Sequence, residues 1–153
     1  MALADRLSVG SQVTLDTDSI IYFVEENPDF IDIVAPVWDP IASGDVAAHV
    51  STVSLTEVLV RPLRLHQEEP AHRYRRILTR SRNLTLHTLT APIAEQAAAL
   101  RAERNLATAD AMIAATALQS GCSHLITNDG KYRGIPGLEV LVIREHAEEK
   151  DKQ

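Results

Sequence analysis

Cysteine and lysine are scarce in this sequence, and their scarcity narrows the classes of protein to which it can belong. Cys122 is the one cysteine among 153 residues, so the chain can form no intramolecular disulfide. Spacings typical of a zinc site are also absent, because His66 and His72, the nearest histidine pair of helical character, have no cysteine beside them. Lysine occurs only at positions 131, 150 and 152, so arginine supplies most of the positive charge.

Long apolar segments are lacking too. The first ten residues, MALADRLSVG, do not contain the apolar stretch of a signal peptide. The longest run without a charged residue, 111–128, includes Gln, Ser, His and Asn and covers an expected helix and an expected strand. This run is therefore unlike a membrane-spanning helix. We expect a cytoplasmic protein that does not contact a membrane.

The overall composition is that of an ordinary globular domain. Apolar residues make up 45% of the chain and charged residues 24%, which excludes intrinsic disorder or a fibrous repeat as the main state. The length fits a single domain, which we place over residues 1–153. We expect its core to span about residues 12–144, preceded by a short N-terminal extension and followed by a charged C-terminal tail.

Positive charge is concentrated in one part of an otherwise acidic chain. The net charge is −6, which argues against a protein that merely coats nucleic acid. Between positions 61 and 82, however, arginines greatly outnumber acidic residues. This segment is either a solvated helical face or a phosphate-binding rim beside an acidic site. The candidates for such contact with a phosphate backbone are Arg61, Arg64, Arg73, Arg75, Arg76 and Arg80.

Short apolar strands alternate with helices along the chain, a pattern typical of an α/β fold with a mostly parallel sheet. We expect strands over 12–16, 46–51, 84–89, 124–127 and 138–143. Helices are expected over 19–26, 30–42, 71–81, 92–104 and 108–121, with Asp29 and Thr108 as N-caps. A further helix starts near Ser54 and is expected to kink or break at Pro62, and the charged end of the chain is expected to fray.

Four acidic residues lie where expected strands end or where the following helices begin. They are Asp16, Glu57, Asp110 and Asp129. Ligands of parallel α/β sheets bind outside the carboxyl ends of the strands, so these side chains are expected to converge at one edge. Carboxylates packed together repel one another, and Mg²⁺ or Mn²⁺ relieves that repulsion because both ions prefer oxygen ligands. Such ions can also activate a water for phosphodiester cleavage.

Each of these acids also has a purely structural explanation. Ser54 and Glu57 have the spacing of a capping box, and Asp110 in a first turn would complement the helix dipole. Asp129 lies in an Asn-Asp-Gly turn sequence, and Asp16 could cap the first helix. The structural explanations require four independent coincidences at strand ends, so we favour a shared site.

Four segments in order carry a resemblance to a known family. They are LDTDSIIYFVE at 15–25, STVSLTEVL at 51–59, RNLATADAMIAATALQSGCSHLITND at 104–129 and IPGLEVLVI at 135–143. Together they resemble PIN domains, and within that superfamily the VapC-type toxins of bacterial toxin–antitoxin pairs. The resemblance covers roughly residues 13–143, and its most specific part is TADAMIAATAL followed by LITND.

The resemblance implies a three-layer α/β/α sandwich with a mostly parallel five-stranded sheet, and a Mg²⁺- or Mn²⁺-dependent endoribonuclease. It also implies a homodimer and a cognate antitoxin that blocks the site. By position, Asp16, Glu57, Asp110 and Asp129 match the family's acidic metal-site residues. The expected supporting residues are Thr17 and Thr127, which match small hydroxyl positions, Asn128, which precedes the last acid, and Asp18, which stands where the family usually has Asn.

In the mechanism that we hypothesise, the principal metal ion is bound by Asp16, Asp110 and Asp129. Glu57 binds a second ion or orients the attacking water. No histidine, serine or cysteine nucleophile is required, and the products would carry 5′-phosphate and 3′-hydroxyl ends.

Other functions remain open at this point. LDTDS resembles the DxD motif of haloacid-dehalogenase-like phosphatases, but Ile20 stands where Thr or Val is needed, and the required lysine is missing. A response-regulator receiver domain fails for similar reasons. A PIN-fold binding module without catalysis, and a PIN nuclease of RNA processing without an antitoxin, remain as alternatives.

Overall fold

The computed structural model describes the backbone of residues 1–151 and the side chains of residues 1–147. Its strands are β1 (Gln12–Leu15), β2 (Ala47–Ser51), β3 (Leu84–His87), β4 (His124–Thr127) and β5 (Glu139–Val142). Its α-helices are α1 (Thr17–Val24), α2 (Ile31–Ser43), α3 (Thr52–Arg64), α4 (Glu68–Arg80), α5 (Ala91–Glu103), α6 (Thr108–Gln119) and α7 (Ile143–Asp151). Two 3₁₀ helices, η1 (Leu3–Arg6) and η2 (Gly130–Tyr132), complete the described elements.

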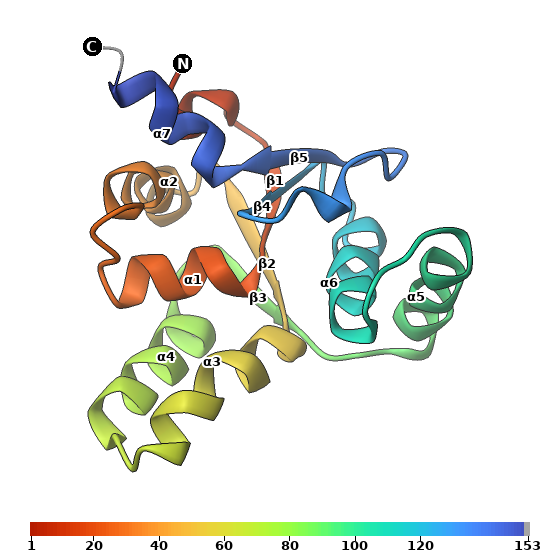
Figure 1. The fold of residues 1–153 in the computed structure, drawn as a ribbon, viewed down its shortest axis with the longest axis horizontal. Coiled ribbons are helices and arrows are strands. Elements are labelled where there is room, and N and C mark those ends of the chain that lie inside the picture. The colour runs from red at the N-terminus through yellow and green to blue at the C-terminus, as the bar shows by residue number, and fades with distance from the viewer. Residues whose placement is uncertain (152–153) are drawn as a thin grey trace.

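The five strands form one sheet in the order β3-β2-β1-β4-β5, and every neighbouring pair is parallel. Helices α1 to α4 lie on one side of this sheet, and α5 and α6 lie on the other (Figure 1). The expected three-layer α/β/α fold is therefore confirmed. The chain order reverses between β1 and β4, and such a switch point opens a crevice at the carboxyl ends of the two strands.

Each side of the sheet has its own apolar core. Val13 and Leu15 of β1 pack with buried residues of α1 to α4, whereas Leu125 of β4 packs with α5 and α6. This alternation follows from the pleat, which points successive side chains of a strand to opposite faces. The rigid centre of the molecule is thus the β1–β4 pair, whose ends position the residues that follow them.

Pro62 does not break its helix, which corrects one of the two outcomes, a kink or a break, expected from the sequence. Helix α3 continues through Pro62 to Arg64. Pro62 is buried, and it lies so near the end of α3 that its missing N–H costs one hydrogen bond of the last turns only. The Pro62 carbonyl accepts a hydrogen bond from Gln67 N at 2.8 Å, which leads the chain into α4.

The two expected N-caps are also wrong. Helix α2 begins after Phe30 rather than Asp29, because Phe30 N and Ile31 N both donate to the carbonyl of Asn27. Helix α6 begins after Ala107, whose carbonyl accepts from Ala111 N, so Thr108 is already inside the helix.

The end of the chain is helical as far as it is described, where fraying was expected. Helix α7 starts at the buried Ile143, and Arg144 N donates to Asn128 Oδ1 at 2.8 Å. This contact satisfies one N–H of the first turn and anchors α7 next to the end of β4. Residues 152–153 lie outside the described part of the chain. Within the described residues, none of the helices combines the length and apolarity needed to cross a bilayer.

Candidate active site

Asp16 connects the two central strands at the switch point. It directly follows β1, and its Oδ1 accepts a hydrogen bond from Thr17 N at 2.8 Å, so it is the N-cap of α1. Its Oδ2 accepts a hydrogen bond of 2.7 Å from the Oγ1 atom of Thr127, which is the last residue of β4. Asp16 N in turn donates to the Ile126 carbonyl at 3.0 Å. The capping role foreseen for Asp16 is real, but it uses one oxygen and leaves the other facing β4.

Asp18 lies beside Asp16 and also reaches across to β4. Its Oδ2 accepts a hydrogen bond from Asn128 N at 2.8 Å. Its Oδ1 is buried and has no hydrogen-bond partner. A buried carboxylate oxygen without a partner is costly unless a cation or water satisfies it. This oxygen is therefore the strongest local sign that the carboxyl ends of β1 and β4 suit a cation.

The pKa values of this pair are shifted in the same direction. Burial raises the pKa of the Asp16 carboxyl from 3.8 to about 7, and Coulombic repulsion from Asp18 adds to the rise. Burial also raises the pKa of Asp18. Asp110 contributes to the rise at Asp16, and Asp129 to that at Asp18, so the four aspartates lie close enough to repel one another. Positive charge placed among them would stabilise their ionised forms.

Asp110 and Asp129 share a cation of the chain itself. Lys131 Nζ lies 2.6 Å from Asp110 Oδ2 and 2.9 Å from Asp129 Oδ2. Asp129 Oδ1 accepts from Lys131 N at 3.0 Å, and Asp110 Oδ1 accepts from the buried Tyr132 hydroxyl at 3.1 Å. Burial acts to raise the pKa of Asp129, but the hydrogen bonds and charge of Lys131 outweigh it and lower that pKa.

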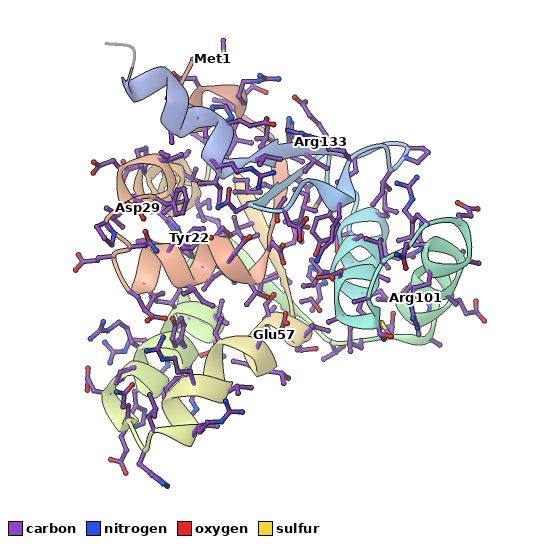
Figure 2. All side chains as sticks on the ribbon, in the orientation of Figure 1. Met1, Tyr22, Asp29, Glu57, Arg101 and Arg133 are labelled. Carbon is purple, nitrogen blue, oxygen red and sulfur yellow. The ribbon has the colours of Figure 1, made fainter. Side chains whose placement is uncertain are left out.

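Glu57 lies at the rim of the site, on α3 near α6 (Figure 2). Its Oε1 accepts a hydrogen bond from Thr17 Oγ1 at 2.7 Å, and Thr17 Oγ1 also contacts Ser54 Oγ at 2.8 Å. The capping-box explanation of Glu57 is wrong, because α3 begins earlier, with Ser51 accepting from Val53 N. Glu57 is therefore tied to the residue next to Asp16 rather than to its own helix end.

The four expected ligands do not form a ready-made metal cage. Among the side chains described, those of residues 1–147, no group of three or more His, Cys, Asp or Glu is arranged to hold a metal ion. Two pairs are present instead: Asp16 with Asp18, and Asp110 with Asp129 around Lys131. The donor set nevertheless fits a hard divalent cation, since it consists of carboxylate oxygens and includes the unpartnered Oδ1 of Asp18.

The candidate RNA-binding arginines occupy the α3–α4 hairpin, and all six are exposed. Arg61 and Arg64 lie in the last turn of α3, and the other four lie on α4. Arg61 and Glu57 line the same surface pocket of about 340 Å³. Arg75, Arg76 and Arg80 line a groove of about 550 Å³ between the two helices, together with Leu55 and Leu59. The α3–α4 hairpin thus places Arg61 beside Glu57 at the rim of the acidic site, and it places the other five arginines farther along the hairpin.

Reasoning from the sequence missed two residues, Lys131 and Tyr132. Lys131 was noted only as one of three scattered lysines. A signal was available, because Asn128-Asp129-Gly130 predicts a turn, and a turn after β4 brings the next residues back toward the sheet edge. Asp110, which pairs with Lys131 of that turn, lies on a helix distant in sequence. The sequence alone therefore does not show that Asp110 lies next to the turn.

These features define a class of protein: a parallel α/β fold with an acidic site at the carboxyl ends of its two central strands. Residues 13–138 match the PIN domain family, and the chain belongs to that family. Because the chain belongs to the PIN domain family, the phosphatase and receiver-domain alternatives are excluded. A comparison with curated protein sequences finds no significant match.

Three solved structures to which this chain is similar come from toxin–antitoxin systems. A toxin–antitoxin complex from Klebsiella pneumoniae is 26% identical, with a TM-score of 0.64 over 83% of this chain and 95% of that chain. VapBC2 from Rickettsia felis, bound to a promoter DNA fragment, is 20% identical, with a TM-score of 0.69 over 86% and 98%. VapC20 of Mycobacterium tuberculosis, a sarcin–ricin-loop-cleaving toxin, is 19% identical, with a TM-score of 0.60 over 74% and 86%.

Proposed function

We propose that this protein is a Mg²⁺- or Mn²⁺-dependent endoribonuclease and the toxin of a VapBC-type toxin–antitoxin pair. The observation that carries the proposal is the set of aspartates at the β1–β4 switch point, with a buried carboxylate oxygen that lacks a partner. Membership of the PIN family and the fold shared with VapC toxins support it.

Asp16, Asp110 and Asp129 would hold the principal ion, and Glu57 would hold a second ion or orient the attacking water. When bound, a divalent ion makes a water more acidic and stabilises the negative charge that develops on the phosphodiester. Thr127 orients Asp16 through its hydroxyl, and Thr17 orients Glu57. The Glu57 carboxylate, held in place at the exposed rim, is suited to accept the proton of the attacking water.

The test is an assay of the purified protein, free of any antitoxin, on a panel of structured RNAs. With Mn²⁺ or Mg²⁺ we expect discrete cuts with 5′-phosphate and 3′-hydroxyl ends, and EDTA should abolish them. Products with 2′,3′-cyclic phosphate ends would contradict the mechanism. If there is no cleavage and divalent ions also leave the melting temperature unchanged, the carboxylates do not form a metal site.

The arginines of α4 are expected to bind the RNA backbone. Reversing the charge of Arg75 and Arg76 together should weaken RNA binding and flatten its dependence on salt, because fewer counterions are released from the RNA. Both side chains are exposed and line the α3–α4 groove, so the double variant Arg75→Glu/Arg76→Glu should keep its fold. The measurement is RNA affinity at several salt concentrations. A salt slope equal to that of the wild type would show that these arginines do not bind RNA.

An antitoxin and a homodimer complete the proposal. The toxin–antitoxin complexes that share the fold favour an antitoxin partner over an RNA-processing nuclease that works alone. A short reading frame for an antitoxin-like protein next to this gene would distinguish the two. A non-catalytic binding module is the second candidate, favoured by the lack of a three-residue metal cluster among the described side chains of residues 1–147. The RNA assay separates that candidate from the nuclease.

A further inference from the structure

The residues that follow β4 engage the carboxylates of Asp110 and Asp129 from one side. Lys131 donates to both, through Nζ to one oxygen of each and through its backbone N to Asp129 Oδ1. Tyr132 donates to the remaining oxygen of Asp110. Every oxygen of the two carboxylates therefore has a donor from residues 131–132, and the two that face each other share a single ammonium.

An ion that bridges Asp110 and Asp129 would need the oxygens that the ammonium now occupies. Nζ lies 2.6 and 2.9 Å from these atoms. A Mg²⁺ ion binds carboxylate oxygens at about 2.0–2.1 Å, so it would lie within the space taken by Nζ. The ammonium and the ion cannot bridge the same oxygen pair together.

The Lys131 side chain can leave without unfolding η2, at the loss of its ion pairs and of a contact between Nζ and the Tyr132 ring, whose centroid lies 5.7 Å away. It is 36% exposed and stands on a long flexible stem, which gives the ammonium a short path to solvent. The contacts that fix the backbone are separate from the ammonium, since Lys131 N keeps Asp129 Oδ1 and Tyr132 keeps Asp110 Oδ1. Exchange therefore requires a change of side-chain rotamer rather than refolding of η2.

We propose that Lys131 is a resident counter-ion of Asp110 and Asp129, and that a divalent cation binds there by displacing its ammonium. The inference rests on the proposed metal site and adds a competitor to it. The ammonium stabilises the carboxylates when no ion is bound, and it lowers the apparent affinity for the ion. Half-saturation of the site by metal then requires a higher free ion concentration than the acidic residues alone would set.

The direct test observes the ammonium in the wild-type protein. Only three lysines are present, so labelling lysine side chains with ¹⁵N gives few Nζ signals, and Lys131→Arg identifies that of Lys131 by its loss. In EDTA we expect this signal to be protected from exchange by the two carboxylates. Titration with Mg²⁺, which is diamagnetic, should shift it to the position of a free ammonium. A Lys131 signal that stays protected at saturating Mg²⁺ would overturn the proposal.

Mn²⁺ affinity, measured by calorimetry, provides the second test. Lys131→Met removes the competitor and should tighten Mn²⁺ binding on the order of tenfold, because two charge-assisted contacts no longer have to be broken. The same variant should melt at a lower temperature than the wild type in EDTA. Arg133→Met is the matched control, since it removes an equal charge from an exposed residue that pairs with Glu145 instead.

The outcomes separate this inference from the function on which it rests. If wild type and Lys131→Met both bind Mn²⁺ with equal affinity, the metal site stands and the competition is wrong. Tightening by the same factor in Arg133→Met would also contradict it, because the effect would then reflect bulk charge. If neither wild type nor Lys131→Met binds Mn²⁺, both the metal site and the competition are wrong.

Discussion

Asp16→Asn is expected to abolish RNA cleavage and, in EDTA near neutral pH, to make the protein more stable. We expect the cleavage rate to fall by roughly 10³-fold or more, because the variant loses the charge of a proposed metal ligand at the centre of the site. The amide keeps an oxygen for Thr17 N, so α1 keeps its N-cap, and the amide NH2 group can donate to Thr127 Oγ1 in place of the hydrogen bond that Thr127 now donates to Asp16. Loss of activity together with a gain in stability is typical of a residue that destabilises the fold but is needed for activity.

The direction of the stability effect follows from the pKa of Asp16. Burial raises this pKa from 3.8 to about 7 in the folded protein, so the unfolded chain gives up the proton more readily. The stability that the wild type has below about pH 4 is therefore lost as the pH rises through about 7. Near pH 8 the variant avoids this loss and should gain roughly 2–4 kcal/mol in unfolding free energy, since one pKa unit corresponds to about 1.4 kcal/mol.

Melting temperatures of variant and wild type, measured from about pH 4 to about pH 8 in EDTA, test this expectation. The difference between the two proteins should grow with pH. Burial lowers the pKa of His49 and His87, which destabilises both proteins equally in acid and cancels in the difference. Asp39→Asn, at an exposed position of α2, is the matched control and should show no such trend. A difference in melting temperature that stays constant across this pH range would mean that ionisation of the buried Asp16 carboxyl does not destabilise the folded protein.

Thr127→Val is expected to cause the largest loss of stability among single changes around the site. The Thr127 hydroxyl is fully buried, donates to Asp16 Oδ2 at 2.7 Å and accepts from Asp129 N at 3.0 Å. Valine has nearly the same shape, so the change removes the hydrogen bonds without opening a cavity. Leaving a buried carboxylate oxygen and a part-buried backbone N–H unpaired should lower the unfolding free energy by roughly 2–4 kcal/mol.

The matched control is Thr127→Ser, which keeps the hydroxyl and loses only a methyl group. It should cost roughly 1 kcal/mol, the value of a buried methyl. Unfolding in urea at constant pH, with and without Mg²⁺, measures both variants. Equal losses for valine and serine would mean that packing of the methyl, and not the hydroxyl, holds Asp16 and the turn after β4 together.

The layout of the fold was predictable because its local signals agree with its long-range structure. Apolar strands flanked by helices indicated a parallel sheet, and each of the five expected strands lies within three residues of its observed bounds. The caps at Asp29 and Thr108 were each misjudged by one residue, because backbone hydrogen bonds to the Asn27 and Ala107 carbonyls set the helix starts. Pro62 was misjudged because it lies two residues before the end of α3, where its missing N–H costs a single hydrogen bond.

The candidate site was predictable only in outline. The positions of Asp16 and Asp129 at strand ends follow from the sequence, since the order of strands places them at one edge. The pairing of Asp110 with Lys131 does not, because it depends on how α6 is oriented against the turn after β4. Nor does the hydrogen bond from Thr17 to Glu57, which joins helices from different crossovers of the fold.

The position of β4 in the sequence determines when the candidate site becomes complete while the chain is being synthesised. Strand β4 supplies Thr127 and leads into Asp129 and Lys131, yet it lies between β1 and β5 in the middle of the sheet. Chains emerge from the ribosome N-terminus first, so β1, β2 and β3 are exposed before β4 can insert beside β1. Until then Asp16 lacks its partner across the sheet. A growing chain therefore carries only half of the candidate site until β4 has left the ribosome. If the proposed function holds, the chain would not cleave RNA before that point.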